Sequence, residues 1–162
     1  MAITKGDVVQ NFTLQNSKGE QESLIDITKN GKALILFFPL AFSSTCTEEL
    51  CVTRDNMKLY NSLKANVAAI SVDSFFVLRE FKKANNLNFT LLSDFNREVS
   101  KQFDIIYDDF YGLKGVPKRA AFVIDENLNV EYAEVLEDAS NLPDFRAIQE
   151  ILSESTKETE AK

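Results

Sequence analysis

Cys46 and Cys51 are the only cysteines of the 162-residue chain, and they stand five positions apart. Thiols at such a spacing can carry redox chemistry, contribute to a metal site or pack in a core. The chain contains no histidine, which excludes cysteine–histidine nucleophile pairs and histidine-ligated metal sites. Since two cysteines alone cannot close a structural zinc site, we interpret the pair as either a redox centre or core packing.

Cys46 follows an apolar run closely and lies at a predicted helix start. The tetrapeptide TCTE, which begins at Thr45, has the form of a capping box with Thr45 as the N-cap. Ser43 and Ser44 are alternative N-caps. All three choices put Cys46 in the first helical turn, where free backbone N–H groups and the helix dipole favour a thiolate. The alternative is that Cys46 packs as a small buried apolar residue.

Cys51 lies further along the same predicted helix. Five helical residues rise about 7.5 Å along the axis, whereas a disulfide needs its α-carbons within about 7 Å. The two thiols therefore cannot bond while the helix is intact, and pairing would require the helix start to unwind. The spacing also differs from the C-x-x-C motif of thioredoxin. If the thiols do not pair, Cys51 is a core residue.

Three other residues have types that suit a site around Cys46. Pro39 has no N–H group to donate, so we expect it to end the preceding strand. Ser43 is expected in a turn or as a helix cap. Arg119 directly precedes the apolar run AAFVID, which places a guanidinium at the mouth of a predicted buried strand. In a chain without histidine, this arginine is the natural cation to hold Cys46 as a thiolate.

The chain around these residues alternates between the hydrophobic periods of strands and helices. The expected strands are 12–14, 21–24, 33–38, 67–72, 89–92, 120–124 and 130–136, and the expected helices are 45–64, 74–85, 96–103 and 143–153. The first two strands and the last two should form hairpins, and 105–118 should be irregular. This order predicts the α/β class: a thioredoxin-like fold with a central mixed β-sheet flanked by helices and an N-terminal β-hairpin extension.

Composition limits the classes of function. Apolar residues make up 44% of the chain and the formal net charge is −7, which argues against general binding to nucleic acid or to anionic membranes. We see no membrane span and no signal peptide, so we expect a cytoplasmic location. A disulfide there is more often transient and catalytic than structural. One domain is expected over 1–152, with a flexible polar tail at 153–162.

The spacing of Pro39, Ser43 and Cys46 fits the pattern P-x3-[TS]-x2-C, which closely resembles the peroxidatic motif of the peroxiredoxins. Glu49 stands where that family usually carries an acidic or polar residue. KRAAFVID, which contains Arg119, resembles the family segment in which an arginine precedes a strand. The likeness runs from about residue 3 to residue 152, although Ser43 replaces the commoner threonine and the opening GDVVQNFTL lacks the usual proline.

Two branches of the peroxiredoxin family are similar to this chain. The C-x4-C spacing resembles the Q-type, or bacterioferritin-comigratory, branch. FPLAFSSTC is equally like the alkyl hydroperoxide reductase E branch, in which many members use a single cysteine. No cysteine lies beyond Cys51, so the arrangement with a C-terminal resolving cysteine in the other subunit is excluded.

The resemblance implies a thiol-dependent peroxidase that reduces hydrogen peroxide and organic hydroperoxides. Cys46 would be the peroxidatic thiolate that becomes a sulfenic acid. Cys51 would resolve that acid as an intramolecular disulfide, which a thioredoxin- or glutaredoxin-like reductant would recycle. The alternatives are a one-cysteine peroxidase resolved by an external thiol and a non-enzymatic peroxide sensor. Neither a cofactor nor a metal is expected, and the chain would be a monomer or a homodimer.

The resemblance also implies roles for the neighbours of Cys46. Ser43, Arg119 and the helix start at Thr45 would bind the peroxide oxygens, in the manner of an oxyanion hole. Pro39 would shield the thiolate from bulk water. Glu49 would orient Arg119, unless it is an ordinary carboxylate of a helix start.

Overall fold

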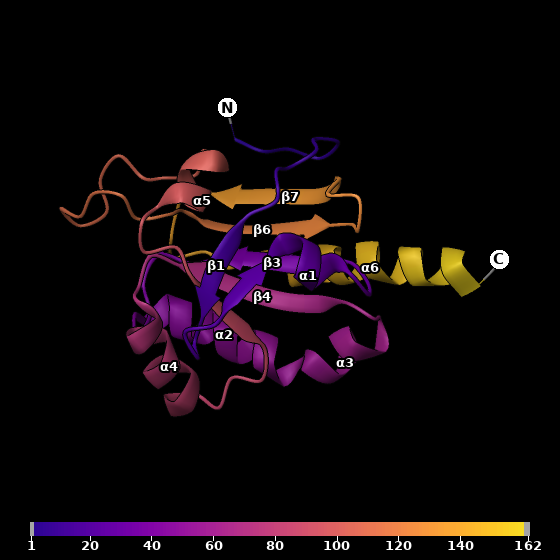
Figure 1. The fold of residues 1–162 in the computed structure, drawn as a ribbon, viewed down its shortest axis with the longest axis horizontal. Helices are drawn as coiled ribbons and strands as arrows, with labels where there is room; N and C mark the ends of the chain where they lie inside the picture. Colours follow the sequence, from indigo (N-terminus) through magenta and orange to yellow (C-terminus); the bar gives the residue numbers. More distant parts are fainter. Residues whose placement is uncertain (1, 161–162) are drawn as a thin grey trace.

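The computed structural model describes residues 2–160. The strands are β1 (Thr13–Asn16), β2 (Gln21–Ser23), β3 (Ala33–Phe37), β4 (Asn66–Ser71), β5 (Thr90–Ser93), β6 (Arg119–Ile124) and β7 (Val130–Leu136). The helices are α1 (Leu24–Thr28), α2 (Ser44–Asp55), α3 (Met57–Ser62), α4 (Phe75–Ala84), α5 (Glu98–Gln102) and α6 (Phe145–Glu160). Figure 1 shows how they are arranged around one sheet.

The sheet has seven strands in the order β2-β1-β5-β4-β3-β6-β7. Strands β3, β4 and β5 are parallel neighbours, whereas β6, β7 and β1 join antiparallel. Parallel neighbours need long crossover connections, which α2 with α3 and then α4 provide. The predicted α/β class with a central mixed sheet is confirmed, and the structure has a thioredoxin-like fold.

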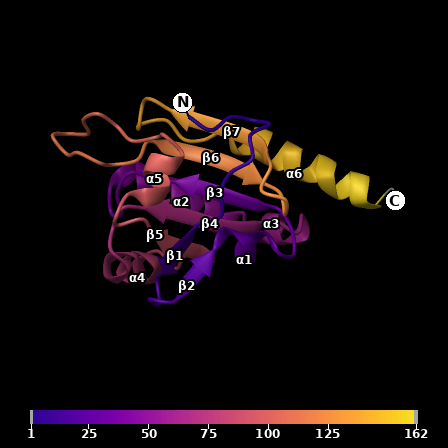
Figure 2. The same ribbon diagram turned by 45° about the horizontal axis from the view of Figure 1, so that its top comes forward.

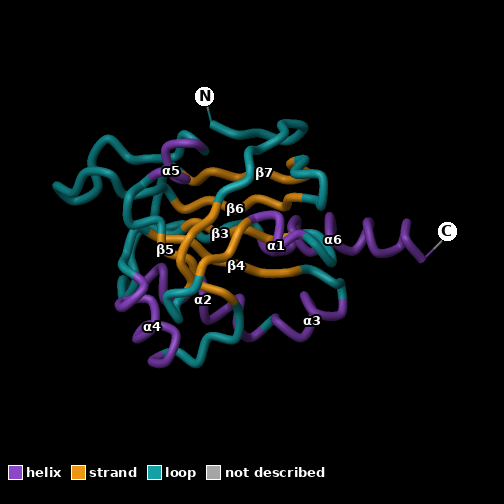
Figure 3. The backbone as a smooth tube through the Cα atoms, viewed as in Figure 1, coloured by secondary structure: helices purple, strands orange, loops and turns teal. Residues whose placement is uncertain are grey.

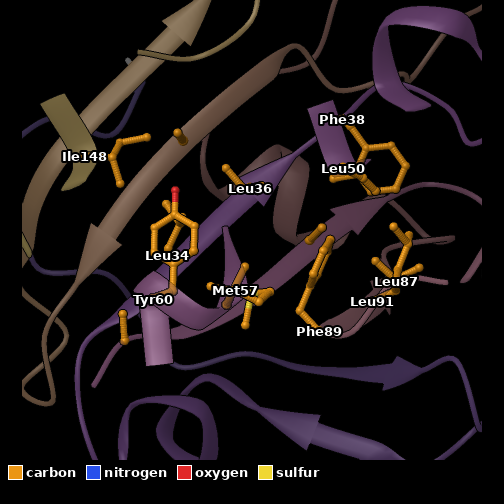
Figure 4. Packing of buried hydrophobic residues seen from close by; sticks show 14 of the residues in the cluster. Leu34, Leu36, Phe38, Leu50, Met57, Tyr60, Leu87, Phe89, Leu91 and Ile148 are labelled. Carbon is orange, nitrogen blue, oxygen red and sulfur yellow. The ribbon is translucent and has the colours of Figure 1, made fainter. Parts of the chain in front are cut away.

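The sheet has a hydrophobic core on each face. All five side chains of β3 are buried, and they alternate between the two cores because successive strand residues point to opposite faces. Leu34 and Leu36 pack with Leu50 of α2 and Ile148 of α6, as Figure 4 shows. The core on the other face is covered by the two short helices α1 and α5, and both contribute residues to it. The core that contains Leu34 and Leu36 therefore packs against α2, the helix that contains both cysteines.

The N-terminal hairpin is confirmed, but its second strand ends earlier than expected. Leu24, predicted as strand, is the first residue of α1, a helix that the sequence analysis missed. Ser23 caps α1: its side chain accepts from the Asp26 amide, and the Asp26 carboxylate accepts from the Ser23 amide. This reciprocal capping box starts a helix in a segment too short for its apolar period to be recognised.

The single helix predicted over 45–64 is wrong, because the structure breaks it into α2 and α3 at Asn56. The backbone of Asn56 leaves the helical region at φ −106° and ψ 7°. Its side-chain amide donates to the Val52 carbonyl at 2.8 Å, a local bond with which asparagine competes with helix continuation. Both cysteines lie in α2, before the break.

The last helix is longer than the predicted 143–153. Helix α6 begins at Phe145 and continues to Glu160, and Figure 2 shows its C-terminal part projecting from the body of the molecule. Ile148 and Leu152 anchor its first half in the core. The last two residues of the expected flexible tail lie outside the described residues, and the tail's mobility stays a prediction.

The segment between α5 and β6 is a long loop, as predicted for 105–118. Figure 3 shows it as the loop that extends farthest from the sheet. It is held at its base by short bridges, such as the Tyr107 amide donating to the Val116 carbonyl at 2.9 Å. Over residues 2–160, no helix combines the length and apolar character that a membrane crossing requires.

Candidate active site at the start of helix α2

Pairing between β3 and β6 brings Cys46 and Arg119 together across 73 sequence positions. In the antiparallel register, Phe37 at the end of β3 lies opposite Ala120. Arg119, the preceding residue of β6, therefore lies beside the chain as it leaves β3 and enters α2. The predicted position of Arg119 at the mouth of a buried strand is confirmed.

Helix α2 begins at Ser44, two residues before Cys46, and its N-cap is one of the two expected alternatives to Thr45. The N-cap is Ser43, not Thr45, and its side chain makes no capping bond. Instead the Ser43 carbonyl accepts from the Thr47 amide at 2.9 Å and from the Thr47 hydroxyl at 2.8 Å. Extended backbone at Ser43 decides the start, which residue preference alone could not do. Cys46 remains in the first helical turn.

Cys46 is buried, with 1% of its surface exposed. Both terminal nitrogens of Arg119, Nη1 and Nη2, donate to its Sγ at 3.4 Å. The buried guanidinium thus faces the sulfur with two N–H groups. A cation this close stabilises negative charge on the sulfur, because it offsets part of the cost of burying that charge.

Arg119 is itself fixed on every side. Its Nη1 also donates to Glu49 Oε2, and Nε and Nη2 donate to the Ala139 carbonyl at 3.3 and 3.0 Å. Burial lowers the pKa of Arg119, but the charges of Glu49 and Cys46 outweigh that effect and raise it. The side chain is therefore a permanent cation in one orientation. Sequence reasoning missed Ala139, because a backbone carbonyl leaves no mark in residue type.

Glu49 lies under the guanidinium with no exposed surface. Burial raises the pKa of Glu49 from 4.5 to about 7, against the opposing charge of Arg119. Its second oxygen, Oε1, is buried without a hydrogen-bond partner. One guanidinium therefore contacts two acidic groups, Glu49 and Cys46, and burying two negative charges beside one cation is costly. The contact that was predicted between Glu49 and Arg119 is present.

An open cleft of about 520 Å³ leads to this cluster. Its lining contains Ser43, Thr45 and Arg119, which were predicted to bind substrate, together with Ala139 and an aromatic wall from Tyr107, Phe110 and Tyr111. The aromatic wall belongs to the long loop between α5 and β6, and it shares the cleft with Arg119. The structure thus gathers the predicted binding residues at one opening.

Pro39 and Ser43 lie on the short connection between β3 and α2. Pro39 is buried two residues after the end of β3, where its missing N–H group is consistent with the end of the strand. The Ser43 hydroxyl donates to the Leu40 carbonyl at 2.8 Å. To donate to a bound peroxide, this hydroxyl would have to exchange that partner.

Cys51 lies apart from the cluster. Both cysteines are free thiols, and the intact α2 runs through both of them. Cys51 is half-buried, and its Sγ donates to Asn85 Oδ1 at 3.8 Å, on the α4 side of the helix. In this state the two thiols are held apart by the helical rise, as expected.

Comparisons with known proteins agree with this geometry. Residues 5–133 match the AhpC/TSA family. Peroxiredoxin Bcp of Escherichia coli K12 is 34% identical over 133 residues, which cover 80% of this chain and 84% of the relative. The chain belongs to the peroxiredoxins.

Other peroxiredoxins show how far the likeness extends. The chloroplastic peroxiredoxin Q of japonica rice is 35% identical over 130 residues, and the match covers 80% of this chain but only 58% of the rice chain. The crystal structure of peroxidoxin BcpB from Mycobacterium tuberculosis superposes with a TM-score of 0.84 at 27% identity. That match covers 94% of this chain and 97% of BcpB. The predicted peroxiredoxin resemblance, with its Q-type character, is confirmed.

Proposed function

We propose that the chain is a thiol-dependent peroxidase that reduces hydrogen peroxide and organic hydroperoxides through Cys46. The observation that carries the proposal is the contact of both Arg119 terminal nitrogens with the Cys46 sulfur at 3.4 Å. This arrangement holds a nucleophile and a cation at one buried point. Membership of the peroxiredoxins supports the same reaction.

In the first step the Cys46 thiolate attacks one peroxide oxygen and the O–O bond breaks. The sulfur is oxidised to a sulfenic acid, and the departing alkoxide or hydroxide takes a proton to leave as alcohol or water. Arg119 stabilises the charge that moves from sulfur to oxygen, since its N–H groups already point at the reacting atom. Ser43 and the helix start at Thr45 complete the oxygen-binding groups, and buried Pro39 limits access of water.

In the second step the Cys51 thiol attacks the Cys46 sulfenic acid, forms a disulfide and releases water. The intact α2 keeps the thiols apart, so its first turn must unwind for this step. An external dithiol of the thioredoxin or glutaredoxin type then reduces the disulfide. Cys51 is half-buried and contacts Asn85 instead of Arg119, which supports its role as the attacking thiol.

Intact-mass measurement after one equivalent of hydrogen peroxide tests both steps. We expect the reduced chain to lose two hydrogens, with a proteolytic peptide that links Cys46 and Cys51. A stable addition of oxygen at Cys46 would instead support a one-cysteine cycle with an external resolving thiol. No reaction of Cys46 within the time of turnover would contradict the peroxidase proposal itself.

Turnover with a reductant distinguishes an enzyme from a sensor. We expect continuous peroxide consumption when thioredoxin, its reductase and NADPH are supplied, and the rate should depend on thioredoxin concentration. Oxidation that stops after one equivalent would indicate a sensor. We propose a cytoplasmic location for this activity. Light scattering would distinguish a monomer from a homodimer.

A further inference from the structure

The connection between β3 and α2 is held by a residue from another strand end. The Ala41 amide, in the middle of this connection, donates to Asp73 Oδ2 at 2.7 Å. Asp73 follows β4 and lies 32 positions away in sequence. A bond this short to a carboxylate is of the strong, charge-assisted kind. The segment 39–43, which leads to Cys46, is therefore tied to the sheet through Asp73.

Asp73 is a rigid acceptor, because hydrogen bonds from the ends of two strands fix its orientation. The Ser71 hydroxyl, at the end of β4, donates to the same Oδ2 at 2.7 Å. The Ser93 hydroxyl, at the end of β5, donates to the Asp73 carbonyl at 2.6 Å. Ser71 and Ser93 are both buried. The carboxylate and the backbone of Asp73 are thus both held, so Ala41 meets a preorganised partner.

The residue after Ala41 shows why such a tie is needed. Phe42 has a φ of 68°, a left-handed conformation that is unfavourable for a bulky residue and persists only where its surroundings impose it. Its ring packs edge-on against Phe81 of α4, with centroids 5.0 Å apart, yet 58% of Phe42 stays exposed. Packing alone holds this turn weakly, and the Asp73 bond adds the fixed point.

We propose that Asp73 is a positioning residue for Cys46 that acts through the Ala41 amide. By holding segment 39–43, it fixes Ser43 as the N-cap of α2 and so presents Cys46 to Arg119. The same bond opposes the unwinding that brings Cys46 to Cys51. This second consequence rests on the proposed resolution by Cys51, whereas the first concerns only the position of Cys46.

Loss of the Asp73 bond should therefore change the two chemical steps in opposite directions. Oxidation of Cys46 slows, because the thiol spends less time against Arg119. Disulfide formation accelerates, because the first turn of α2 unwinds more readily. General destabilisation of the fold does not produce this pair of opposite changes. The ratio of the two rates is thus the measurement that isolates a positioning role.

The experiment compares Asp73→Ala with the wild-type chain in stopped-flow reactions with hydrogen peroxide. We expect Cys46 oxidation to slow by roughly ten- to a hundredfold, the range that corresponds to losing one hydrogen bond to a charged group. Disulfide formation should become faster. Asp73→Asn keeps an oxygen that can accept from Ala41, so it should restore most of the wild-type ratio. If Asp73→Ala does not fold, Asp73→Ser removes the contact with a smaller polar change.

Asp125 provides a matched control. It accepts two backbone amide bonds at 2.9 Å in the turn between β6 and β7, at the opposite end of β3. Asp125→Ala should leave the ratio of the two rates unchanged. If Asp73→Ala shifts both rates in the same direction, or behaves as Asp125→Ala does, the positioning role is wrong.

Amide hydrogen exchange tests the same inference without peroxide. In Asp73→Ala, residues 41–47 should exchange at least roughly tenfold faster, while the strands keep their protection. Unchanged exchange at 41–47 would overturn the role of Asp73 even if the peroxidase proposal holds. Conversely, faster exchange in a chain that does not react with peroxide would keep the Asp73 tie and reject the peroxidase.

Discussion

Cys46 and Cys51 share one helix, yet their surroundings have little in common. Cys46 is 1% exposed and receives two N–H groups of Arg119 at 3.4 Å. Cys51 is half-buried and meets an asparagine oxygen at 3.8 Å. Residue type and helix are the same for both, so neither explains the difference. The difference comes from β6, which sets the Arg119 guanidinium in direct contact with the Cys46 sulfur, whereas Arg54 acts on Cys51 through its charge.

The contrast teaches that the helix start by itself does not make the site. Position in the first turn gives Cys46 free N–H groups and a favourable dipole, an effect of the helix alone. Arg119 adds a full charge from a distant strand, and Glu49 and Ala139 hold that charge in place. The comparison predicts that substitutions near Cys46 change peroxide reduction or stability strongly, and that substitutions near Cys51 change them less.

Exchanging each cysteine for serine should give the largest difference. Cys46→Ser should lower peroxide reduction by roughly 10³-fold or more, because the nucleophile is lost. Cys51→Ser should leave the first oxidation of Cys46 within about threefold of wild type, since the bond that it loses is a weak thiol contact. Stopped-flow kinetics with a single equivalent of peroxide measures both. Substantial activity in Cys46→Ser would reverse the assignment.

Arg119→Met should produce the next largest effect. It removes both donors to the Cys46 sulfur, and loss of such preorganised stabilisation costs roughly 10²–10³ in rate. Lys118→Met is the matched control, because this neighbouring cation pairs with Glu137 at 2.7 Å instead of with Cys46. We expect second-order rate constants near wild type for the control. Equal losses in both variants would mean that general surface charge, and not the Arg119 contact, assists the reaction.

Glu49 should make the stability of the fold depend on pH. Its pKa is raised from 4.5 to about 7, so between these values the folded chain binds a proton that the unfolded chain has released. The free energy of unfolding should therefore fall as pH rises through this window, by on the order of 3 kcal/mol. Glu49→Gln cannot ionise and should lack this fall.

Urea unfolding at several pH values across that window measures the effect. Glu48→Gln is the control, because Glu48 is exposed at the neighbouring position of the same helix, and it should keep the wild-type slope. A Glu49→Gln variant whose stability falls with pH as steeply as wild type would show that Glu49 is ionised at lower pH than its burial implies.

Asn85→Ala should give the smallest effect. It removes the oxygen that faces Cys51 and the side-chain amide that donates to the Phe81 carbonyl at 3.2 Å. The bond from Arg54 Nη1 at 2.7 Å goes to the Asn85 backbone carbonyl and is retained. A thiol is a weak donor, so the free energy of unfolding should change by about 1 kcal/mol, mainly through the lost bond to Phe81. Alkylation of Cys51 should rise by at most a few-fold, and peroxide oxidation of Cys46 should not change. A tenfold slower oxidation would mean that the two environments are coupled.

Local patterns in the chain were sufficient to predict most of the fold. The run ALILFF marks a strand buried on both faces, and the structure forms β3 there with every residue buried. The predicted elements were wrong where a side chain forms a hydrogen bond with the backbone of a residue three or four positions away. Ser23 and Asp26 start an unexpected helix, and Asn56 stops one that the apolar period continues. Such bonds depend on backbone angles that hydrophobic period does not report.

The sequence by itself identified a thiol and an arginine as the candidate reactive pair. It contains no histidine, it has a cysteine at a helix start after a buried strand, and it has an arginine before another buried strand. Each of these signals is local, because it depends on residue types within one element and on the period of its apolar positions. They were enough to predict Cys46, and not Cys51, as the reactive thiol.

Only the tertiary structure decided how that pair is held. The pairing of β3 with β6 sets Arg119 against Cys46, burial raises the pKa of Glu49 beneath it, and Asp73 reaches the Ala41 amide from the loop after β4. These contacts join residues that are tens of positions apart, and their strength depends on burial and on exact direction. The pattern of residue types along the chain reports neither burial nor direction, because both are set when the sheet brings separate strand ends together.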